Sequence, residues 1–136
     1  FKPQLIKLTR KLNLNDNVNF FGWISSKRKN LLLKKAHCLC VPSVREGWGL
    51  VVLEANCVGT PAIVYNVPGL RDAVKNRING IITLKNTPQS LAECLIEFFN
   101  SPILRTTLSK NAFSISRNFN WDKTAEDFLE IIEKQI

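Results

Sequence analysis

The sequence predicts an α/β fold, a Rossmann-like doubly wound parallel sheet with helices on both faces. Segments with helical periodicity alternate with short apolar segments along the chain, as in repeated βα units. The apolar segments lack polar alternation, which is typical of strands covered on both faces. One of them, residues 38–41, leads into a polar loop with two glycines and then a helix. In such sheets ligands bind where strands end in this way.

Length and composition predict one domain over residues 1–136. The chain has 136 residues, of which 45% are hydrophobic and 22% charged, as in ordinary globular domains. No apolar run approaches the roughly 18 residues of a membrane span, and the start lacks a signal-peptide pattern. We therefore expect a cytoplasmic protein. The chain contains no methionine and begins with Phe1, so we expect the domain to be truncated at its N-terminus.

The first third of the chain predicts two helices and one strand. Residues 3–11 place leucines on one side of a helix. Residues 18–21 form an apolar segment that ends at a glycine and predicts a strand. A second helix is expected over residues 27–36, with Ser25 or Ser26 as its N-cap.

The middle of the chain predicts three strands and two helices. The strand at residues 38–41 is expected to be buried on both faces. An apolar helix follows over residues 49–58, and a glycine ends it. Further along, residues 61–65 predict a strand, residues 70–74 a short helix, and residues 81–82 another short strand.

Three helices are expected to close the chain, over residues 89–100, 103–118 and 121–135. Each shows apolar residues at helical spacing. We expect the apolar stripe of the last helix to pack on its own domain. The alternative is that part of this stripe contacts another domain of the protein. The stripe consists of Trp121, Ala125, Phe128 and Ile132.

The four cysteines do not have metal-ligand spacing, and we expect no metal site. Cys38 and Cys40 lie two apart in an apolar segment, so a strand places them on one face. We expect all four cysteines to be small buried hydrophobic residues. A redox pair, or a metal site completed by His37, is the alternative.

The net charge of +8 permits nucleic acid, an anionic membrane surface or a phosphorylated small molecule as a partner. The cluster Lys27–Lys29 lacks interleaved aromatic residues, so the sequence does not favour nucleic acid. A solvated lysine-rich surface explains the charge equally well.

The most informative segment is residues 42–55, where a strand end, a polar loop and a helix start follow one another. Glycines in the loop let a ligand approach the backbone, and the helix start offers free N–H groups to a phosphate or a sugar hydroxyl. Glu46 lies in the loop, and Glu54 lies in an apolar helix. Because burying an unpaired carboxylate costs several kcal/mol, Glu54 either reaches solvent or holds a polar ligand.

Seven residues separate Glu46 from Glu54, with Gly-Trp-Gly-Leu after the first and Ala after the second. This arrangement resembles the paired-glutamate signature of the group 1 family of retaining glycosyltransferases, which have the GT-B fold. Neighbouring segments agree in order over nearly the whole chain. These segments are residues 18–22, 36–43, 59–64, 68–74, 79–82 and 120–121.

The resemblance implies a role for each matching residue. Glu46 is expected to act as the catalytic residue that contacts hydroxyls of the transferred sugar, and Glu54 to accept hydrogen bonds from the ribose. Backbone around Trp23 and Ile24 is expected to meet the base, and the turn 68–69 to line the same cleft. Backbone N–H groups are expected to hold the sugar and the diphosphate, and they belong to Gly47, Trp48, Gly49 and Leu50.

The implied reaction transfers a sugar from a nucleoside-diphosphate sugar to an acceptor with retention of configuration, with no obligatory metal or cofactor. This chain resembles the C-terminal, donor-binding half of the GT-B architecture, without its first strand. In the family, the Arg and Lys that grip the diphosphate and the acceptor-binding domain precede the first helix found here. The chain alone is therefore expected to be inactive, with Lys27 and Arg28 as surface residues.

Two other functions stay open at this stage. One is a nucleotide-sugar epimerase of GT-B architecture, and the other is a nucleotide-sugar-binding module without turnover. A retaining glycosidase is disfavoured, because its two carboxyl groups lie about 5–5.5 Å apart. The sequence does not identify the donor sugar, the base or the acceptor. Its basic charge suggests a lipid-linked acceptor and peripheral membrane contact.

Overall fold

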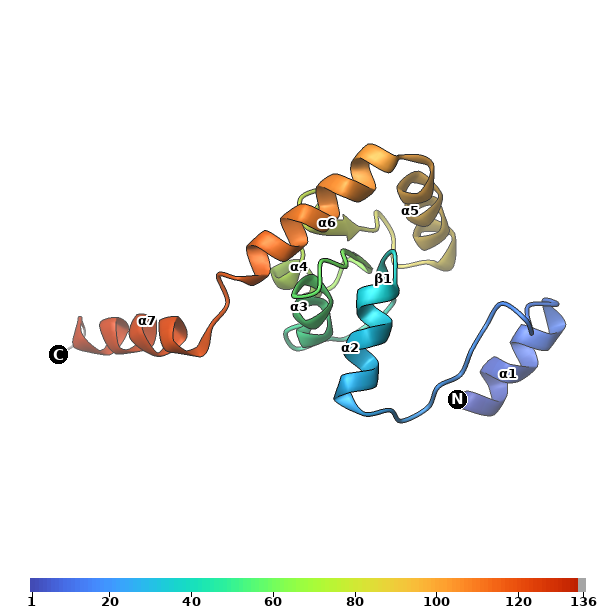
Figure 1. The fold of residues 1–136 in the computed structure, drawn as a ribbon, viewed down its shortest axis with the longest axis horizontal. Helices are drawn as coiled ribbons and strands as arrows, with labels where there is room; N and C mark the ends of the chain where they lie inside the picture. Colours follow the sequence, from blue (N-terminus) through green and yellow to red (C-terminus); the bar gives the residue numbers. More distant parts are fainter. Residues whose placement is uncertain (135–136) are drawn as a thin grey trace.

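A three-stranded parallel sheet lies at the centre of the structure, a computed structural model that describes residues 1–134 (Figure 1). The strands are β1 (Leu39–Val41), β2 (Ala62–Val64) and β3 (Gly80–Ile82), in the order β1-β2-β3. Both neighbouring pairs are parallel, with Cys40 opposite Ile63 in the register. The predicted parallel sheet is therefore confirmed, and each of its strands spans three residues.

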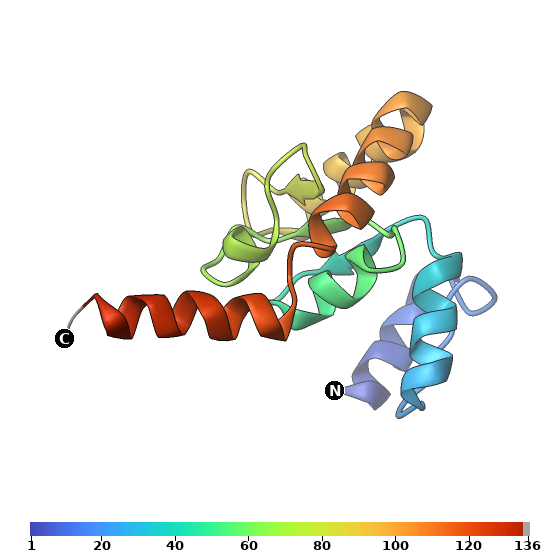
Figure 2. The same ribbon diagram turned by 60° about the vertical axis from the view of Figure 1, so that its left-hand side comes forward.

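Helices cover both faces of this sheet (Figure 2). On one face lie α3 (Leu50–Asn56) and α4 (Leu70–Ala73), and on the other lie α5 (Pro88–Asn100) and α6 (Pro102–Ser116). Each helix agrees with the predicted one to within about two residues at either end. This arrangement is the doubly wound fold that the sequence predicts.

The core divides into two clusters because side chains alternate between the faces of a strand. Ala62 and Val64 pack toward α3 and α4 together with Val52 and Leu70. Ile63 points the other way, toward α5 and α6, where it meets a cluster of fully buried side chains. These are Phe98, Leu108 and Ile81. Strand β2 is buried at all three positions, as expected for a central parallel strand.

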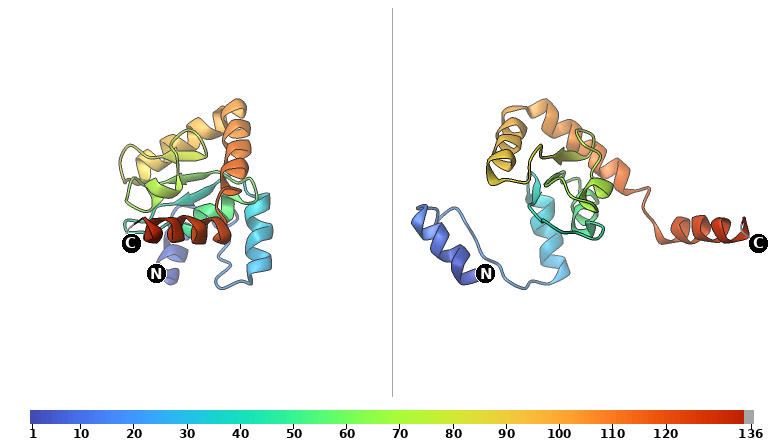
Figure 3. Two further views of the ribbon diagram at one scale, coloured as in Figure 1. Left: turned by 90° about the vertical axis from the view of Figure 1, so that its left-hand side faces the viewer. Right: turned by 180° about the vertical axis from the view of Figure 1, so that it is seen from behind.

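Two helices precede the sheet, α1 (Lys2–Lys11) and α2 (Ser26–Lys35). The Ser25 hydroxyl accepts a hydrogen bond from the Arg28 N–H at 3.3 Å, so Ser25 is the N-cap of α2. Helix α2 packs against α3, whereas α1 lies apart from the sheet (Figure 3). The leucine side of α1 is consequently about half exposed, at Leu5, Leu8 and Leu12.

The predicted strand at residues 18–21 is wrong for this structure. The segment runs in irregular conformation and forms no ladder with the sheet. Val18 is 37% and Phe21 47% exposed. Apolar character favours a strand only where a partner strand supplies hydrogen bonds. Within residues 1–134 no strand lies on the outer side of β1 to supply them.

Helix α7 (Trp121–Glu133) projects away from the sheet and its helices (Figure 1). All side chains of residues 122–134 are exposed, including Phe128 at 62% and Ile132 at 41%. The expectation that this apolar stripe packs on its own domain is therefore wrong. The side chain of Trp121 and the predicted helix end at Gln135 lie outside the described part of the chain.

No helix within residues 1–134 combines the length and the apolar character needed to cross a bilayer.

Candidate functional site

The loop between β1 and α3, residues 42–49, begins at the carboxyl edge of the sheet. It ends at Gly49, which is buried, has φ +74° and precedes the first residue of α3. A Cβ atom at this position would lie 3.2 Å from both Ala73 Cβ and Leu70 Cδ2. The positive φ and this close approach both favour glycine. Gly49, the second glycine of the motif, therefore lies where the start of α3 packs closely against α4.

A second loop, residues 65–69, follows β2 and packs directly on the first loop. Gly69 has φ +80°, and a Cβ atom there would lie 2.6 Å from the carbonyl oxygens of Glu46 and Gly47. The two loops therefore meet backbone against backbone. The structure brings the turn at residues 68–69 together with Glu46 at the carboxyl ends of β1 and β2.

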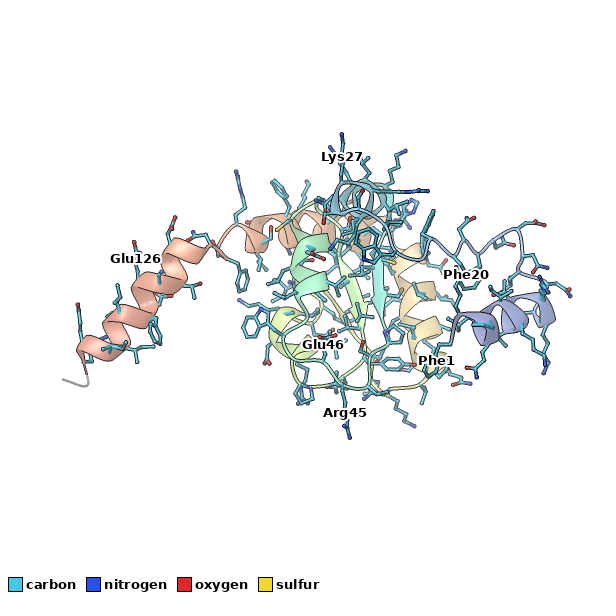
Figure 4. All side chains as sticks on the ribbon, turned by 90° about the horizontal axis from the view of Figure 1, so that it is seen from below. Phe1, Phe20, Lys27, Arg45, Glu46 and Glu126 are labelled. Carbon is cyan, nitrogen blue, oxygen red and sulfur yellow. The ribbon has the colours of Figure 1, made fainter. Side chains whose placement is uncertain are left out.

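Glu46 is half-buried between these loops, while the neighbouring Arg45 points away from the body of the protein (Figure 4). One carboxylate oxygen of Glu46, Oε1, accepts a hydrogen bond from the Gly47 N–H at 3.2 Å. This bond bends the side chain back over its own loop. Glu46 thus lies at the carboxyl edge of the sheet, where a ligand of this fold is expected.

Three successive backbone N–H groups follow Glu46 and Gly47 without a hydrogen-bond partner among the described residues. They belong to Trp48, Gly49 and Leu50. Trp48 is 48% and Leu50 66% exposed, whereas Gly49 between them is buried. Unpaired N–H groups at a helix start can donate hydrogen bonds to an acceptor outside the helix. The arrangement can hold anionic or hydroxylated groups.

Glu54 lies one turn further along α3 and is paired with Lys29 of α2. The Lys29 Nζ atom lies 2.6 Å from Glu54 Oε1, and the two side chains are 38% and 42% exposed. The sequence predicts that Glu54 either reaches solvent or holds a polar ligand. In the structure the Glu54 carboxylate reaches solvent and also pairs with a basic side chain. Sequence reasoning expected neighbouring Lys27 and Arg28 to be surface residues, as both are, and it missed Lys29.

Trp23 and Ile24 precede α2 and lie about twenty residues before the first glycine loop in the chain. The Trp23 side chain is 95% exposed, and Ile24 is half-buried. Trp23 therefore contacts little of the described protein. The structure gathers Glu46, Gly47 and Gly69 in one place, and it leaves Trp23 open to solvent.

The cysteines differ from the expectation of four buried thiols, because Cys40 and Cys57 are exposed and Cys38 and Cys94 are half-buried. Cys40 is exposed because it lies on β1, whose outer side has no neighbouring strand among the described residues. A hydrogen bond between the Cys38 and Cys40 thiols, together with burial, raises the pKa of Cys38. The same hydrogen bond lowers the pKa of Cys40.

Within residues 1–134 no group of three His, Cys, Asp or Glu side chains lies close enough to hold a metal ion. The exposed His37 ring instead packs edge-on against Phe99, with ring centroids 5.8 Å apart.

Asn56 is a second residue that sequence reasoning missed. It lies on α3 two residues after Glu54, is fully buried, and neither polar atom of its amide has a partner among the described residues. Buried amides are usually paired. In sequence, Asn56 resembles any helix-end asparagine, so no local signal marks it.

The fold and its loops define a doubly wound α/β domain with glycine turns after two adjacent parallel strands. Comparison with known proteins then identifies the family. The profile of the family described as Glycosyl transferases group 1 matches residues 2–115. This chain belongs to the group 1 glycosyltransferase family, as its paired glutamates indicate.

Curated relatives are similar over most of this chain. The D-inositol 3-phosphate glycosyltransferase of Salinispora tropica is 33% identical over 127 residues, which are 93% of this chain and 26% of that protein. An uncharacterized glycosyltransferase of Methanocaldococcus jannaschii is 34% identical over 124 residues, which are 91% of this chain and 35% of that protein. The chain thus spans about a quarter to a third of the length of these relatives.

Solved structures show the same fold. Sucrose-phosphate synthase from Thermosynechococcus elongatus aligns with a TM-score of 0.86 and 28% identity, covering 98% of this chain and 34% of that one. HepE of Anabaena in complex with UDP aligns with a TM-score of 0.87 and 21% identity, covering 98% and 37%. The predicted fold, that of the C-terminal half of a GT-B enzyme, is confirmed.

Proposed function

We propose that this chain is the nucleotide-sugar-binding domain of a retaining glycosyltransferase. In the intact protein it binds the donor, and a sugar passes from a nucleoside diphosphate to an acceptor. The observation that carries the proposal is the packing of two glycine turns at one edge of the sheet, where a Gly69 Cβ would lie 2.6 Å from Glu46 O. This packing supports a compact ligand platform beside Glu46.

Each part of the platform suits one part of a sugar donor. The Glu46 carboxylate accepts hydrogen bonds from hydroxyls of the transferred sugar. The free N–H groups of residues 48–50 hold the sugar and the diphosphate. This role is supported by membership of the family, and by HepE of Anabaena, whose structures contain UDP and UDP-glucose.

Departure of the diphosphate is the step that needs most electrostatic help, because negative charge grows on the leaving oxygen. Backbone N–H groups are suited to this task because they are held in place before the reaction begins. In this proposal, basic side chains of the intact protein add positive charge beside the diphosphate. The chain described here therefore supplies part of the site and does not turn over alone.

Glu54 is proposed to bind the ribose, and backbone at Trp23 and Ile24 to meet the base. Glu54 is 42% exposed in its side chain and keeps one oxygen outside the Lys29 ion pair. A carboxylate with a free oxygen accepts hydrogen bonds from a ribose diol. The exposed Trp23 side chain offers a flat surface, while the adjacent backbone supplies donors and acceptors.

Calorimetric titration of the intact protein with UDP, GDP and ADP tests this assignment. We expect one nucleotide to bind, and Glu54→Ala to weaken it by about tenfold, as loss of a hydrogen bond to a charged group does. Glu126→Ala is the matched control, because Glu126 is exposed on the projecting helix α7 (Figure 4). Binding that is identical in wild type and Glu54→Ala would contradict the site.

Turnover separates the proposed transferase from the two other functions. A binding module binds the nucleotide sugar without consuming it, and an epimerase changes the sugar without releasing the nucleotide. A transferase releases free nucleoside diphosphate when an acceptor is present, and Glu46→Ala should abolish that release. Quantifying free and sugar-bound nucleotide by chromatography distinguishes the three.

We also propose that the intact protein contacts an anionic membrane surface and uses a lipid-linked acceptor. The charge is uneven: ten of the 19 Lys and Arg residues but one of the 11 Asp and Glu residues lie within residues 1–45. That third of the chain therefore has a net charge of +9 and the remainder of −1. Helix α1 combines basic residues with leucines that are about half exposed, as membrane-surface helices do.

Vesicle flotation tests the membrane contact. The intact protein should float with phosphatidylglycerol vesicles, less with phosphatidylcholine, and less again at high salt. Replacing Lys7 and Arg10 with Glu should reduce flotation, whereas the same change at Lys110 and Lys123, on α6 and α7, should not. Absence from anionic vesicles at low salt would contradict this proposal and leave the donor site untouched.

A further inference from the structure

An ion pair joins α2 to α3 at the proposed ribose site. Lys29 Nζ lies 2.6 Å from Glu54 Oε1, and 25 residues separate the two positions in the chain. Both side chains are partly buried, at 38% and 42% exposure. The pair therefore lies at the junction of two packed helices rather than on a freely moving surface.

The position of Lys29 is set by the packing of its helix. Leu33, one turn further along α2, is buried, and residues four apart share one helix face. The Leu33 carbonyl accepts a hydrogen bond from the Thr60 hydroxyl at 2.7 Å, just before β2. Helix α2 is thus held to the sheet on the side that carries Lys29. The Lys29 ammonium group is directed toward Glu54.

The pairing leaves Glu54 with one occupied and one open carboxylate oxygen. Among the described residues, Lys29 is the side chain that donates to this carboxylate, and it contacts Oε1. A free carboxylate can present either oxygen in many rotamers, but one held by an ammonium group keeps the other oxygen in a defined direction. Such pre-organisation strengthens binding because less side-chain freedom is lost when the ligand arrives.

We propose that Lys29 is a positioning residue for the nucleotide ribose. Its ammonium group holds Glu54 Oε1, so that Oε2 accepts a hydrogen bond from a ribose hydroxyl. This inference rests on the proposed function, because it takes Glu54 as the ribose-binding carboxylate. It adds that Lys29 acts through Glu54 and without contacting the nucleotide. The pair then favours ribonucleotides over their 2′-deoxy or 3′-deoxy counterparts.

The two neighbouring basic residues do not share this arrangement. Lys27 is exposed and lies at the outer side of α2, far from Glu46 (Figure 4). The Arg28 guanidinium lies over the Phe21 ring, 5.4 Å from its centroid. Lys27 therefore provides a matched control in the same helix, with the same charge and no contact to Glu54.

Titration calorimetry on the intact protein tests the inference with UDP, GDP and ADP and with the 2′-deoxy and 3′-deoxy forms of whichever binds. We expect wild type to prefer the ribonucleotide by about tenfold over at least one deoxy form. Lys29→Met should weaken ribonucleotide binding by about threefold to tenfold and leave deoxynucleotide binding nearly unchanged. Lys29→Arg should restore much of the preference, and Lys27→Met should retain it all.

The Glu54→Gln variant and the double variant make the two failures distinguishable. Glu54→Gln should remove the preference, and adding Lys29→Met to it should have no further effect, because the two residues act as one unit. If Lys29→Met keeps the wild-type preference, or weakens ribose and deoxyribose forms equally, the inference is wrong while the donor site stands. If Glu54→Gln keeps the preference, or wild type binds none of the probes, the proposed ribose site itself is wrong. Melting temperatures verify folding, and Lys29→Gln replaces a Met variant that does not fold.

Discussion

The backbone of Gly69 rests on the carbonyl oxygen of Glu46, so closely that a Cβ atom on Gly69 would come within 2.6 Å of that oxygen. Twenty-three positions along the chain separate these residues, yet they form a close junction between the two loops at the carboxyl edge of the sheet. The junction ties the position of the candidate catalytic carboxylate to the turn after β2.

Gly69→Ala should consequently lower stability and impair donor binding. The new methyl group adds strain at φ +80° and a clash with two carbonyl oxygens, a cost of about 2–4 kcal/mol. Gly47→Ala is the control, because a Cβ atom there meets no atom within 4 Å. Urea unfolding of the two variants should show a large loss for Gly69→Ala and little change for Gly47→Ala. Equal stabilities would show that the loops relax apart without cost.

Phe98→Ala should destabilise the domain by about 3–5 kcal/mol, because it removes a large side chain from a closed core. Phe98 is 1% exposed and packs with Ile63 and Leu108 beneath the sheet. Its neighbour Phe99 is 48% exposed, so Phe99→Ala should cost about 1 kcal/mol or less. Chemical denaturation compares the pair. An equal loss of stability in Phe99→Ala and Phe98→Ala would contradict the placement of Phe98 in the core and Phe99 on the exposed side of α5.

Asn56→Leu should raise stability by about 1–2 kcal/mol, since it replaces a fully buried amide without partners by an apolar group of similar shape. Asn79→Leu is the matched opposite. The Asn79 amide is equally buried, and it accepts from the Lys75 N–H at 2.7 Å and donates to the Ala73 carbonyl at 3.1 Å.

Thermal unfolding of both asparagine variants should therefore give shifts of opposite sign. A lower melting temperature for Asn56→Leu would mean that the Asn56 amide has a hydrogen-bonding partner in solution, such as a water molecule.

Cys40 should react with iodoacetamide at lower pH than Cys38. The hydrogen bond between the two thiols lowers the pKa of Cys40 and raises that of Cys38, and the thiolate is the reactive form. As pH rises, Cys40 therefore becomes a thiolate first, and it is also the more exposed of the two. Mass spectrometry of alkylated peptides across a pH series measures both midpoints.

Removing the Cys38 thiol provides the control for this prediction. In Cys38→Ala the Cys40 thiolate loses its hydrogen-bond donor, so the reaction midpoint of Cys40 should move to higher pH. An unchanged midpoint would show that the two thiols do not interact in solution.

Local pattern predicted most of the architecture. Helices α5 and α6 and strand β2 lie within about two residues of their expected bounds, because spacing at 3.6 residues and short apolar runs are properties of neighbouring positions. The paired glutamates and their glycines identified the family for the same reason, since a motif needs nothing beyond its own segment. The N-cap of α2 at Ser25 also followed from adjacent residues.

The failures all concern partners that lie far away in the chain. Residues 18–21 have strand composition, but a strand also requires a neighbour, and the described residues offer none. The stripe on α7 has core spacing, but its described residues from 122 to 134 contact solvent. Cys40 reads as a core residue, yet it occupies the outer strand of the sheet and is exposed.

The sequence by itself determined the alternation of helices and strands, the two glycine turns and the family to which the chain belongs. The tertiary structure alone decided that Gly69 supports Glu46 and that Lys29 holds Glu54. The physical reason is that side-chain periodicity reports which face of an element is buried, whereas the contact between two elements depends on how the whole core packs. Residues such as Lys29, polar and ordinary in sequence, acquire a role through that packing.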